Sequence, residues 1–232
     1  MQQERPVPYV TLVALLLGRI GVEGFLSTWP AARFASTTLL VTAVAATAGA
    51  VADRGRTRLF LAFGALIVCA NLASEIAGLG SSVGLASLVV AFGMIATTAV
   101  LILRDVLRMR VTDLRTLAGG VAVYLLLSGG FSVLHLALER FAPGSYAGPA
   151  GPLVGPEWAS YFSIVTITGV GYGEITPASG PARSVAALEA VVGQLYLTIL
   201  VGRLVGLELQ GRASFGEGEA VAGGRGPDRP SS

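Results

Sequence analysis

The sequence is short of charged residues and contains no lysine. Charged side chains make up 13% of its 232 residues, and all sixteen basic residues are arginine. Soluble domains carry about 25% charged residues. Because 53% of the residues are hydrophobic, the shortage of charge indicates a membrane protein. The net charge of +2 is too small, and the arginines are too scattered, to indicate nucleic-acid binding.

Side chains that bind metals or act as nucleophiles are also scarce. The single cysteine, Cys69, excludes an intramolecular disulfide and a cysteine-based metal site. It lies in an apolar run and is interpreted as a small buried hydrophobic residue. No cluster of histidine, cysteine and acidic residues indicates an active site, so neither catalysis nor a cofactor is expected. Residues 1–8 do not resemble a cleavable signal, because no small-residue cleavage pattern follows before Arg19.

Six segments could cross a bilayer as helices, each of which takes about 20 apolar residues. The second segment is short and rich in alanine and threonine, whereas the fourth carries no charge. The segments are 9–27, 37–52, 58–78, 82–103, 116–138 and 183–207. The predicted fold class is therefore an all-α membrane protein with six transmembrane helices.

The arginines predict the orientation of these helices. Most of them lie in two connections, between the second and third segments and between the fourth and fifth: Arg54, Arg56 and Arg58, then Arg104, Arg108, Arg110 and Arg115. Arginine-rich connections stay on the cytoplasmic side. With six spans, both termini are expected in the cytoplasm of a multi-pass protein of the cell membrane.

The connection 139–182 contains an apolar stretch that is too short to cross the membrane. Residues 139–156 form a Gly/Pro-rich loop on the outer side. Residues 157–168, "EWASYFSIVTIT", suit a re-entrant helix. Residues 210–232 are small, polar and glycine-rich, and are expected to be disordered. The predicted domains are a four-helix membrane domain (1–115), a pore domain (116–209) and a cytoplasmic tail (210–232).

Glycine occupies every second position within "TITGVGYGEITP", residues 166–177. A dinucleotide-binding loop would need a strand before it and a helix after it in a βαβ unit, which is absent. Turn glycines alone do not explain the alternation with Val170 and Tyr172. Non-helical backbone at membrane depth is tolerated where it lines a water-filled path. Glycine accepts the alternating backbone angles that aim successive carbonyls at one axis. We therefore interpret the run as an ion filter, with Val170 and Tyr172 pointing outward and bracing it against the short helix.

Here the chain resembles the potassium-channel pore family, whose signature is TVGYG. The resemblance rests on "VGYG" at 170–173, the short helix before it and "EITP" after it, and covers about residues 157–207. It implies passive, potassium-selective conduction by a homotetramer in a lipid bilayer, with K⁺ held by four carbonyl oxygens, those of Gly169, Val170, Gly171 and Tyr172. The implied site comprises Thr168, Gly169, Val170, Gly171, Tyr172 and Gly173, with Glu174 at the outer mouth.

The sequence departs from the family at three positions. Gly169 stands where the family has threonine, so we expect a weaker innermost ion site, which Gly169→Thr would strengthen. Glu174 replaces the usual aspartate and reaches about one bond further. Val165 leaves the short helix apolar where the family places one half of a brace behind the filter.

The sixth segment resembles the inner helix of the family. Gly193 is either the hinge that the family places there or a close-packing residue. Glu189 and Gln194 are polar residues within this span. Intramembrane ionisable groups face the protein interior or water, so Glu189 is expected either behind the filter or facing the upper cavity. Arg203 is expected to snorkel to the cytoplasmic surface.

The first four segments lack the arginine pattern of a voltage sensor. A sensing helix carries arginine at regular intervals within the membrane field, whereas Arg104 and Arg108 follow the apolar run of the fourth segment. We expect weak or absent voltage dependence. In the first segment, Arg19 and Glu23 lie one helical turn apart and are expected to form a structural ion pair.

Three further polar residues have simple interpretations. Glu75 and His135 are expected near the outer surface, with His135 as a lone interfacial histidine rather than a pH sensor. Asn71 could bond across helices. Two functional alternatives stay open: a non-selective cation channel, suggested by Gly169, and a non-conducting membrane scaffold or enzyme. The gating stimulus is not predicted.

Overall fold

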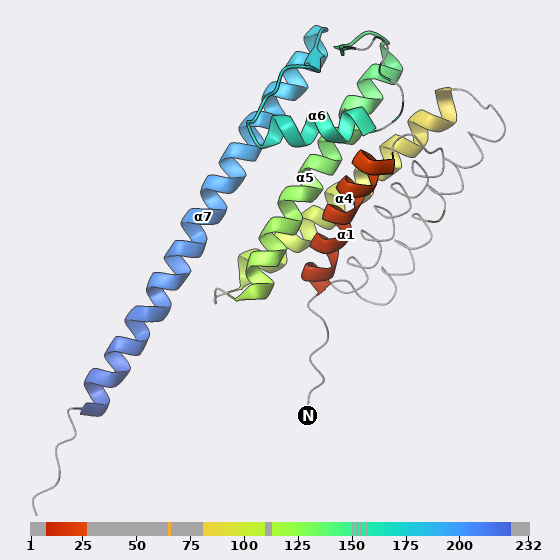
Figure 1. The fold of residues 1–232 in the computed structure, drawn as a ribbon. Helices are drawn as coiled ribbons and strands as arrows, with labels where there is room; N and C mark the ends of the chain where they lie inside the picture. The colour runs from red at the N-terminus through yellow and green to blue at the C-terminus, as the bar shows by residue number, and fades with distance from the viewer. Residues whose placement is uncertain are drawn as a thin grey trace, which may run out of the picture.

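The computed structural model describes residues 8–26, 65, 81–109, 113–149, 151, 153, 155 and 157–223. In chain order the elements are α1 (Pro8–Leu26), α4 (Ser81–Arg108), α5 (Leu114–Phe141), β1 (Tyr146–Ala147), α6 (Glu157–Ile167), β2 (Thr176–Pro177) and α7 (Gly180–Gly223) (Figure 1). The predicted spans 37–52 and 58–78 lie outside the described residues, apart from Ala65, as do Cys69, Asn71 and Glu75.

The described part of the chain is mostly helical. Within it, three helices are long and apolar enough to cross a membrane: Ser87–Arg108, Leu114–Phe141 and Gly180–Leu209. They overlap the predicted segments 82–103, 116–138 and 183–207. Helix α1 corresponds to segment 9–27 but is not among these three, and it carries Arg19 and Glu23.

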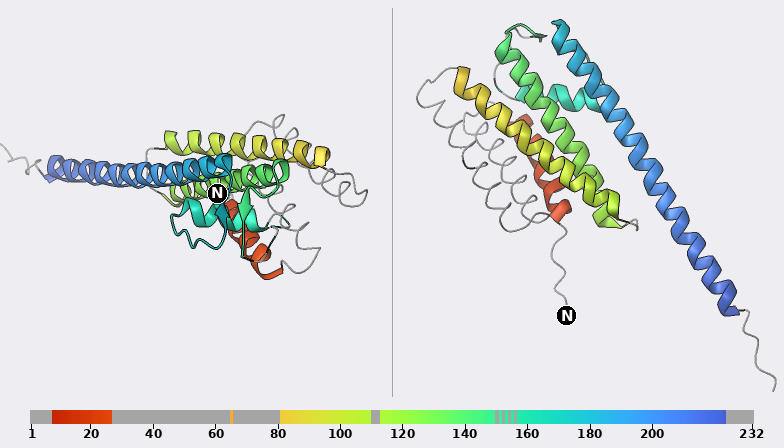
Figure 2. Two further views of the ribbon diagram at one scale, coloured as in Figure 1. Left: turned by 90° about the horizontal axis from the view of Figure 1, so that it is seen from above. Right: turned by 180° about the vertical axis from the view of Figure 1, so that it is seen from behind.

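Helix α5 is the central element, since it packs against α1, α4, α6 and α7. Helix α6 crosses the space between α5 and α7 near one end of the molecule, at a steep angle to both (Figures 1 and 2). Its 11 residues rise only about 16 Å, about half of the hydrocarbon thickness of a bilayer. The expected short helix at 157–168 is therefore present and does not span.

The main core joins α1, α4 and α5. It contains Tyr9, Leu12 and Leu16 of α1, together with residues of α4 from Met94 to Val106 and of α5 from Ala118 to Leu126. At Gly119 of α5 the helices approach closely, because an added Cβ would lie 2.5 Å from Val106 Cγ2. Helix α5 begins at a cap in which the Asp113 side chain accepts from the Thr116 backbone N–H. This bond lowers the pKa of Asp113.

Polar contacts tie the helices together at the opposite end from α6. Asp105 of α4 accepts hydrogen bonds from Tyr9 of α1 and from Arg115 of α5. Arg203 Nη2 of α7 donates to the carbonyl oxygens of Leu107 and Met109, at 2.8 Å each. The expectation that Arg203 merely snorkels is wrong, because its guanidinium bonds to one of the last carbonyls of α4, which lack helical partners, and to that of Met109 just after the helix.

The expectation of a disordered tail from residue 210 is wrong for residues 210–223, which continue α7. Three alanines, two glutamates and an arginine in this stretch favour helix, whereas its four glycines oppose it. The preceding helix also removes the cost of nucleation. Residues 224–232 lie outside the described part of the chain.

Gly119→Ala tests the close approach of α4 and α5. The added methyl group would overlap Val106 and approach the Tyr9 ring, and overpacking of this kind costs about 1–3 kcal/mol. We expect a lower melting temperature of the purified protein in detergent. Gly18→Ala is the matched control, since an added Cβ there meets nothing within 4 Å. Equal melting temperatures for the two variants would contradict the described packing.

Candidate functional site

The short helix α6 is held by its buried face. Trp158, Ala159 and Phe162 pack with Tyr146, Ala182 and Ala186, so the helix is fixed between β1 and the start of α7. At its end, the Thr168 backbone N–H and hydroxyl both donate to the Ile164 carbonyl, at 3.1 and 2.7 Å. The helix therefore ends immediately before the glycine run.

The glycine run has an alternating backbone. Gly169, Gly171 and Gly173 have φ values of 76°, 56° and 87°, whereas no non-glycine residue in the described chain has positive φ. The backbone N–H groups of Gly169 and Gly171 donate to the carbonyls of Thr166 and Val165, at 3.0 and 3.2 Å. The alternation of hand expected from the glycine spacing is present in the backbone geometry.

The side chains between these glycines are largely exposed in the single chain. Val170 is 54% exposed and Tyr172 is 70% exposed. The expectation that they brace the run against the short helix stays a prediction about the assembled ring. Their apolar surface is open for contacts from outside this chain.

Two stacked tyrosines connect α5 with α6 and α7 near the end of α6. Tyr124 of α5 donates to the Ile167 carbonyl at 2.9 Å, and its ring stacks with that of Tyr196 of α7 at 6.0 Å. Tyr196 in turn donates to the Gly120 carbonyl at 2.7 Å. The sequence reasoning missed both tyrosines.

The spacing of polar residues on α5 nevertheless predicts this contact. Four residues with polar groups on α5, namely Tyr124, Ser128, Ser132 and His135, follow one another at spacings of four, four and three. Such spacings place side chains on one face of a helix. All four make hydrogen bonds to α6, α7 or β1.

The outer side of the run is tied down by a short sheet. Strand β1 pairs antiparallel with β2, with Tyr146 opposite Pro177. Ala178 N donates to the Ser145 carbonyl at 2.8 Å. Glu174 is exposed and accepts a hydrogen bond from the Tyr161 hydroxyl of α6. The acid at the expected outer mouth thus has a partner on the short helix, although Val165 supplies none.

Gly193 is a close-packing position in this structure. A Cβ added there would lie 2.5 Å from both the Ile167 carbonyl oxygen and its Cγ1. Helix α7 therefore contacts the end of α6 through a residue without a side chain. The neighbouring Gln194 is exposed, and its Nε2 would lie 3.3 Å from a Cβ added to Gly169.

Glu189 and His135 form a buried pair behind α6. Both are 0% exposed, and Glu189 Oε2 lies 2.6 Å from His135 Nε2. Of the two placements left open for Glu189, the structure has one packed against the short helix α6, with no exposure. The interpretation of His135 as a lone interfacial histidine is wrong, because the fold brings Glu189 and Tyr146 to its two ring nitrogens.

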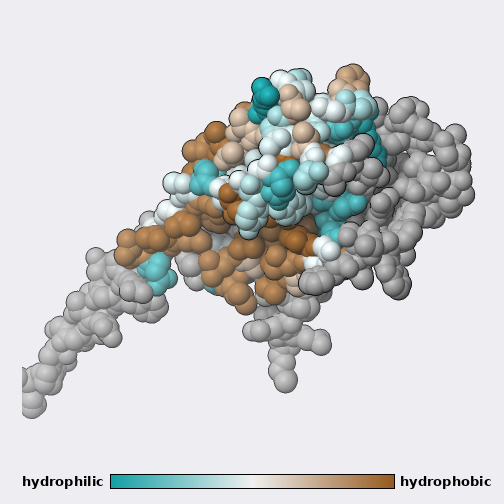
Figure 3. Space-filling view, turned by 45° about the horizontal axis from the view of Figure 1, so that its top comes forward, coloured by the Kyte–Doolittle hydropathy of each residue, from teal (hydrophilic) through white to brown (hydrophobic). Residues whose placement is uncertain are grey.

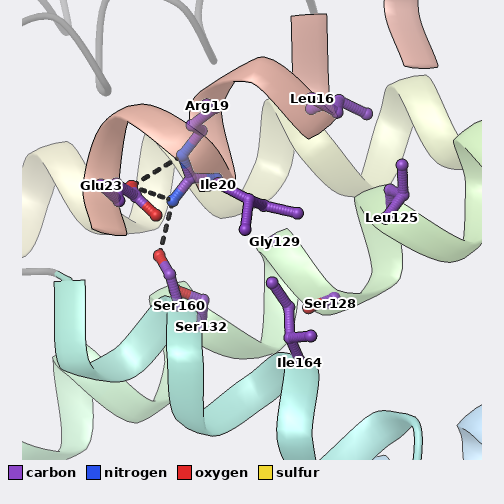
Figure 4. A pocket seen from close by; sticks show the side chains of 10 residues that line it. All are labelled: Leu16, Arg19, Ile20, Glu23, Leu125, Ser128, Gly129, Ser132, Ser160 and Ile164. Atoms are coloured by element: carbon purple, nitrogen blue, oxygen red, sulfur yellow. Dashed lines mark hydrogen bonds and ion pairs between the residues drawn. The ribbon is translucent and has the colours of Figure 1, made fainter. Parts of the chain in front are cut away.

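The expected Arg19–Glu23 ion pair is confirmed, with 2.8 Å between Nη2 and Oε1. The same Arg19 nitrogen donates to Ser160 Oγ of α6 at 2.6 Å. Figure 4 shows this contact beside a cavity of ≈ 20 Å³ between α1, α5 and α6. A cavity of this size holds about one water molecule. Helix α1 is thus connected directly to the short helix.

Among the described residues, no three or more His, Cys, Asp and Glu side chains gather as a possible metal site. The chemistry available around 166–177 comes instead from backbone carbonyl groups. Such groups bind hard cations without a covalent step.

Comparisons with known proteins agree with this site. Residues 155–207 match the family described as "Ion channel". A two pore potassium channel c from Oryza sativa subsp. japonica is 37% identical over 70 residues, which are 29% of this chain and 15% of that protein. The chain thus spans a small part of that relative. No solved structure matches. The matches support an ion channel of potassium-channel type, a membrane protein that is not an enzyme.

Gly193→Ala distinguishes packing from hinge motion. If Gly193 serves packing, the added methyl group pushes α7 away from Ile167 and costs about 1–3 kcal/mol. We then expect a lower melting temperature of the purified protein together with a smaller ion current in planar bilayers. Gly202→Ala in the same helix is the control, because its added Cβ meets nothing within 4 Å. A changed open probability in single-channel recordings, at an unchanged melting temperature, would instead favour a hinge at Gly193.

Proposed function

We propose that this protein is a potassium-selective channel that conducts K⁺ passively as a homotetramer. The observation that carries the proposal is the positive φ of Gly169, Gly171 and Gly173, directly after a helix too short to span the membrane. The proposed filter comprises Thr168, Gly169, Val170, Gly171, Tyr172 and Gly173. Its K⁺ ligands are the carbonyl oxygens of Gly169, Val170, Gly171 and Tyr172, with Glu174 at the outer mouth.

Alternating backbone hand is what a carbonyl filter requires. Residues of one hand send successive carbonyls to opposite sides of an extended chain, whereas alternation turns them toward a common axis. Four such loops surround an ion, and each chain contributes one. The exposure of Val170 and Tyr172 supports a tetramer, since neighbouring subunits would cover them.

The surface of α7 supports the same assembly. Four large apolar residues on one face of this helix, Leu188, Val191, Leu195 and Ile199, are exposed in the single chain. In Figure 3, hydrophobic surface gathers at the left and lower part of the coloured surface, whereas polar surface gathers at its upper centre. Lipid or neighbouring subunits would cover this apolar surface in the membrane.

The proposed domains are a four-helix membrane domain (1–115), the pore domain (116–209) and the segment 210–232, which begins as a continuation of α7. Six spans would place both termini in the cytoplasm of a cell-membrane protein. No ligand-binding module is proposed on the tail.

Gly169 is the departure from the family signature that bears on ion selectivity. Its φ of 76° is a conformation that residues with side chains rarely adopt. The expectation that Gly169→Thr simply strengthens the innermost site therefore does not fit this backbone, because threonine would force the loop to rearrange. The innermost site is proposed to use backbone carbonyls alone.

Recording under bi-ionic conditions tests the proposal. In planar bilayers with K⁺ on one side and Na⁺ at equal concentration on the other, the current should reverse far from 0 mV, at a potential that opposes the flow of K⁺. Gly171→Ala should abolish conduction, because φ of 56° costs a residue with a side chain about 1–2 kcal/mol. Gly144→Ala is the matched control, since its φ is 86° in the loop after α5, and it should conduct.

A reversal potential near zero would favour the second candidate, a non-selective cation channel, for which the absence of a threonine at position 169 is the supporting observation. A wild-type protein without any current would contradict both and favour a non-conducting membrane scaffold.

Voltage dependence is expected to be weak. Arg104 and Arg108 are exposed near the end of α4, after its uncharged run. Moving one charge across the membrane is worth about 2.3 kcal/mol per 100 mV, and charges outside the field contribute little. Arg104→Gln with Arg108→Gln should therefore leave the conductance–voltage relation unchanged. A shallower relation in this double variant would contradict the expectation.

A further inference from the structure

Glu189 is a fully buried carboxylate at the meeting point of α5, α6 and α7. Its Oε1 accepts a hydrogen bond from Ser163 Oγ of α6, and its Oε2 lies 2.6 Å from His135 Nε2 of α5. Burial of a carboxylate is costly unless it is hydrogen-bonded. One side chain of α7 therefore holds both other helices at a single point.

His135 extends this contact to the outer end of the protein. Its Nδ1 lies 2.6 Å from the Tyr146 hydroxyl. Tyr146 N donates to Glu139 Oε2 at 3.0 Å, and Tyr146 is paired with Pro177 of β2. A series of contacts thus runs from Glu189 to the segment that follows Gly173.

The surroundings of the pair are largely aromatic. The His135 ring lies 4.9 Å from the ring of Phe162 and 5.4 Å from that of Tyr146. Among the residues that the structure describes, the other titratable side chains that face the pair are Tyr124 and Tyr146, with Glu139 beyond Tyr146. About one helical turn earlier on α6, beside Ser160, Arg19 and Glu23 bond to each other. In such an environment each hydrogen bond is stronger and each missing partner costs more.

The Ser163 hydroxyl also lies 2.7 Å from the Ser128 carbonyl, and we assign its single proton to the ionised carboxylate, the stronger acceptor. With Glu189 ionised and His135 neutral, Nε2–H donates to Oε2, Tyr146 donates to Nδ1, and Ser163 donates to Oε1. A proton taken up from water makes the pair neutral overall and turns Nδ1 into an N–H donor, whether it rests on the imidazole or on the carboxyl group. The bond to Tyr146 then reverses direction, because the tyrosine oxygen must accept.

We propose that Glu189 is a positioning residue for the filter, and that proton uptake by the Glu189–His135 pair loosens its hold on α6 and lowers potassium conduction. This inference rests on the function proposed above. Ser163 lies one helical turn before Ile167, the last residue of α6. A bond from Ser163 to an ionised carboxylate is about twice as strong as one to a neutral acceptor. Partial or complete neutralisation of Glu189 therefore weakens the fixation of α6.

The test uses the full-length protein in planar bilayers while the outer pH is lowered from about 8 to about 5, the range in which histidines change charge. The wild-type K⁺ current should fall roughly fivefold. Glu189→Gln keeps an oxygen for Ser163 but resembles the protonated pair. Its current should equal the acid level of the wild type at every pH. Glu23→Gln, which changes a carboxyl group of α1 whose partner Arg19 bonds to Ser160, is the matched control and should keep the wild-type pH profile.

A second measurement does not depend on conduction. His135 is the single histidine of the chain, so ¹⁵N-histidine labelling gives the NMR signals of one imidazole ring. These signals should titrate in the wild type and shift in Glu189→Gln. If that variant does not assemble, His135→Gln takes its place in the recordings and should remove the pH response.

The outcomes separate the two proposals. A potassium-selective wild type whose pH response survives in Glu189→Gln or His135→Gln overturns the inference and leaves the proposed function intact. A wild type that does not select potassium overturns the proposed function, and this inference with it. Loss of the pH response in both variants, with the response kept in Glu23→Gln, supports the inference.

Discussion

The structure depends on one constraint. A short helix and the non-helical segment after it do not run the length of the helix bundle, yet their polar groups must find hydrogen-bond partners inside it. Helix α6 ends at Ile167, and polar groups at membrane depth that lack partners are costly. Each neighbouring helix therefore supplies a hydrogen-bonding side chain. Arg19 of α1 bonds to Ser160, Tyr124 of α5 to the Ile167 carbonyl, and Glu189 of α7 to Ser163.

Helix α5 is the platform on which this arrangement is built. Its contacts with α6 and β1 come from one polar face, whereas its glycines allow the other helices to approach. At Gly120 an added Cβ would lie 2.9 Å from the side chain of Leu200 of α7. Helix α5 thus holds α6 by hydrogen bonds along one part of its length and packs closely against apolar side chains along another. The position of α6 is therefore set by the whole bundle.

Much of this architecture could be predicted from local sequence. Apolar length located three of the six predicted spans among the described residues. The 12-residue stretch before the glycines located α6, because helix rise and bilayer thickness leave little freedom. Glycine spacing predicted the alternating backbone. The Glu189–His135 pair could not be predicted, since the two residues are 54 positions apart and only tertiary packing joins them. The bonds of Arg203 to α4 were missed for the same reason. The tail was misjudged because composition alone ignores the helix that precedes it.

The length of α7 has a mechanical consequence. Arg203 is bonded to the carbonyls of Leu107 and Met109, and beyond it α7 continues for 20 residues to Gly223, or about 30 Å. A stiff rod held at its base amplifies rotation, so a tilt of about 5° at Arg203 displaces the far end by about 3 Å given that length. A change too small to disturb the contacts of α7 with the other helices would therefore arrive at its far end as a movement of about two covalent bond lengths.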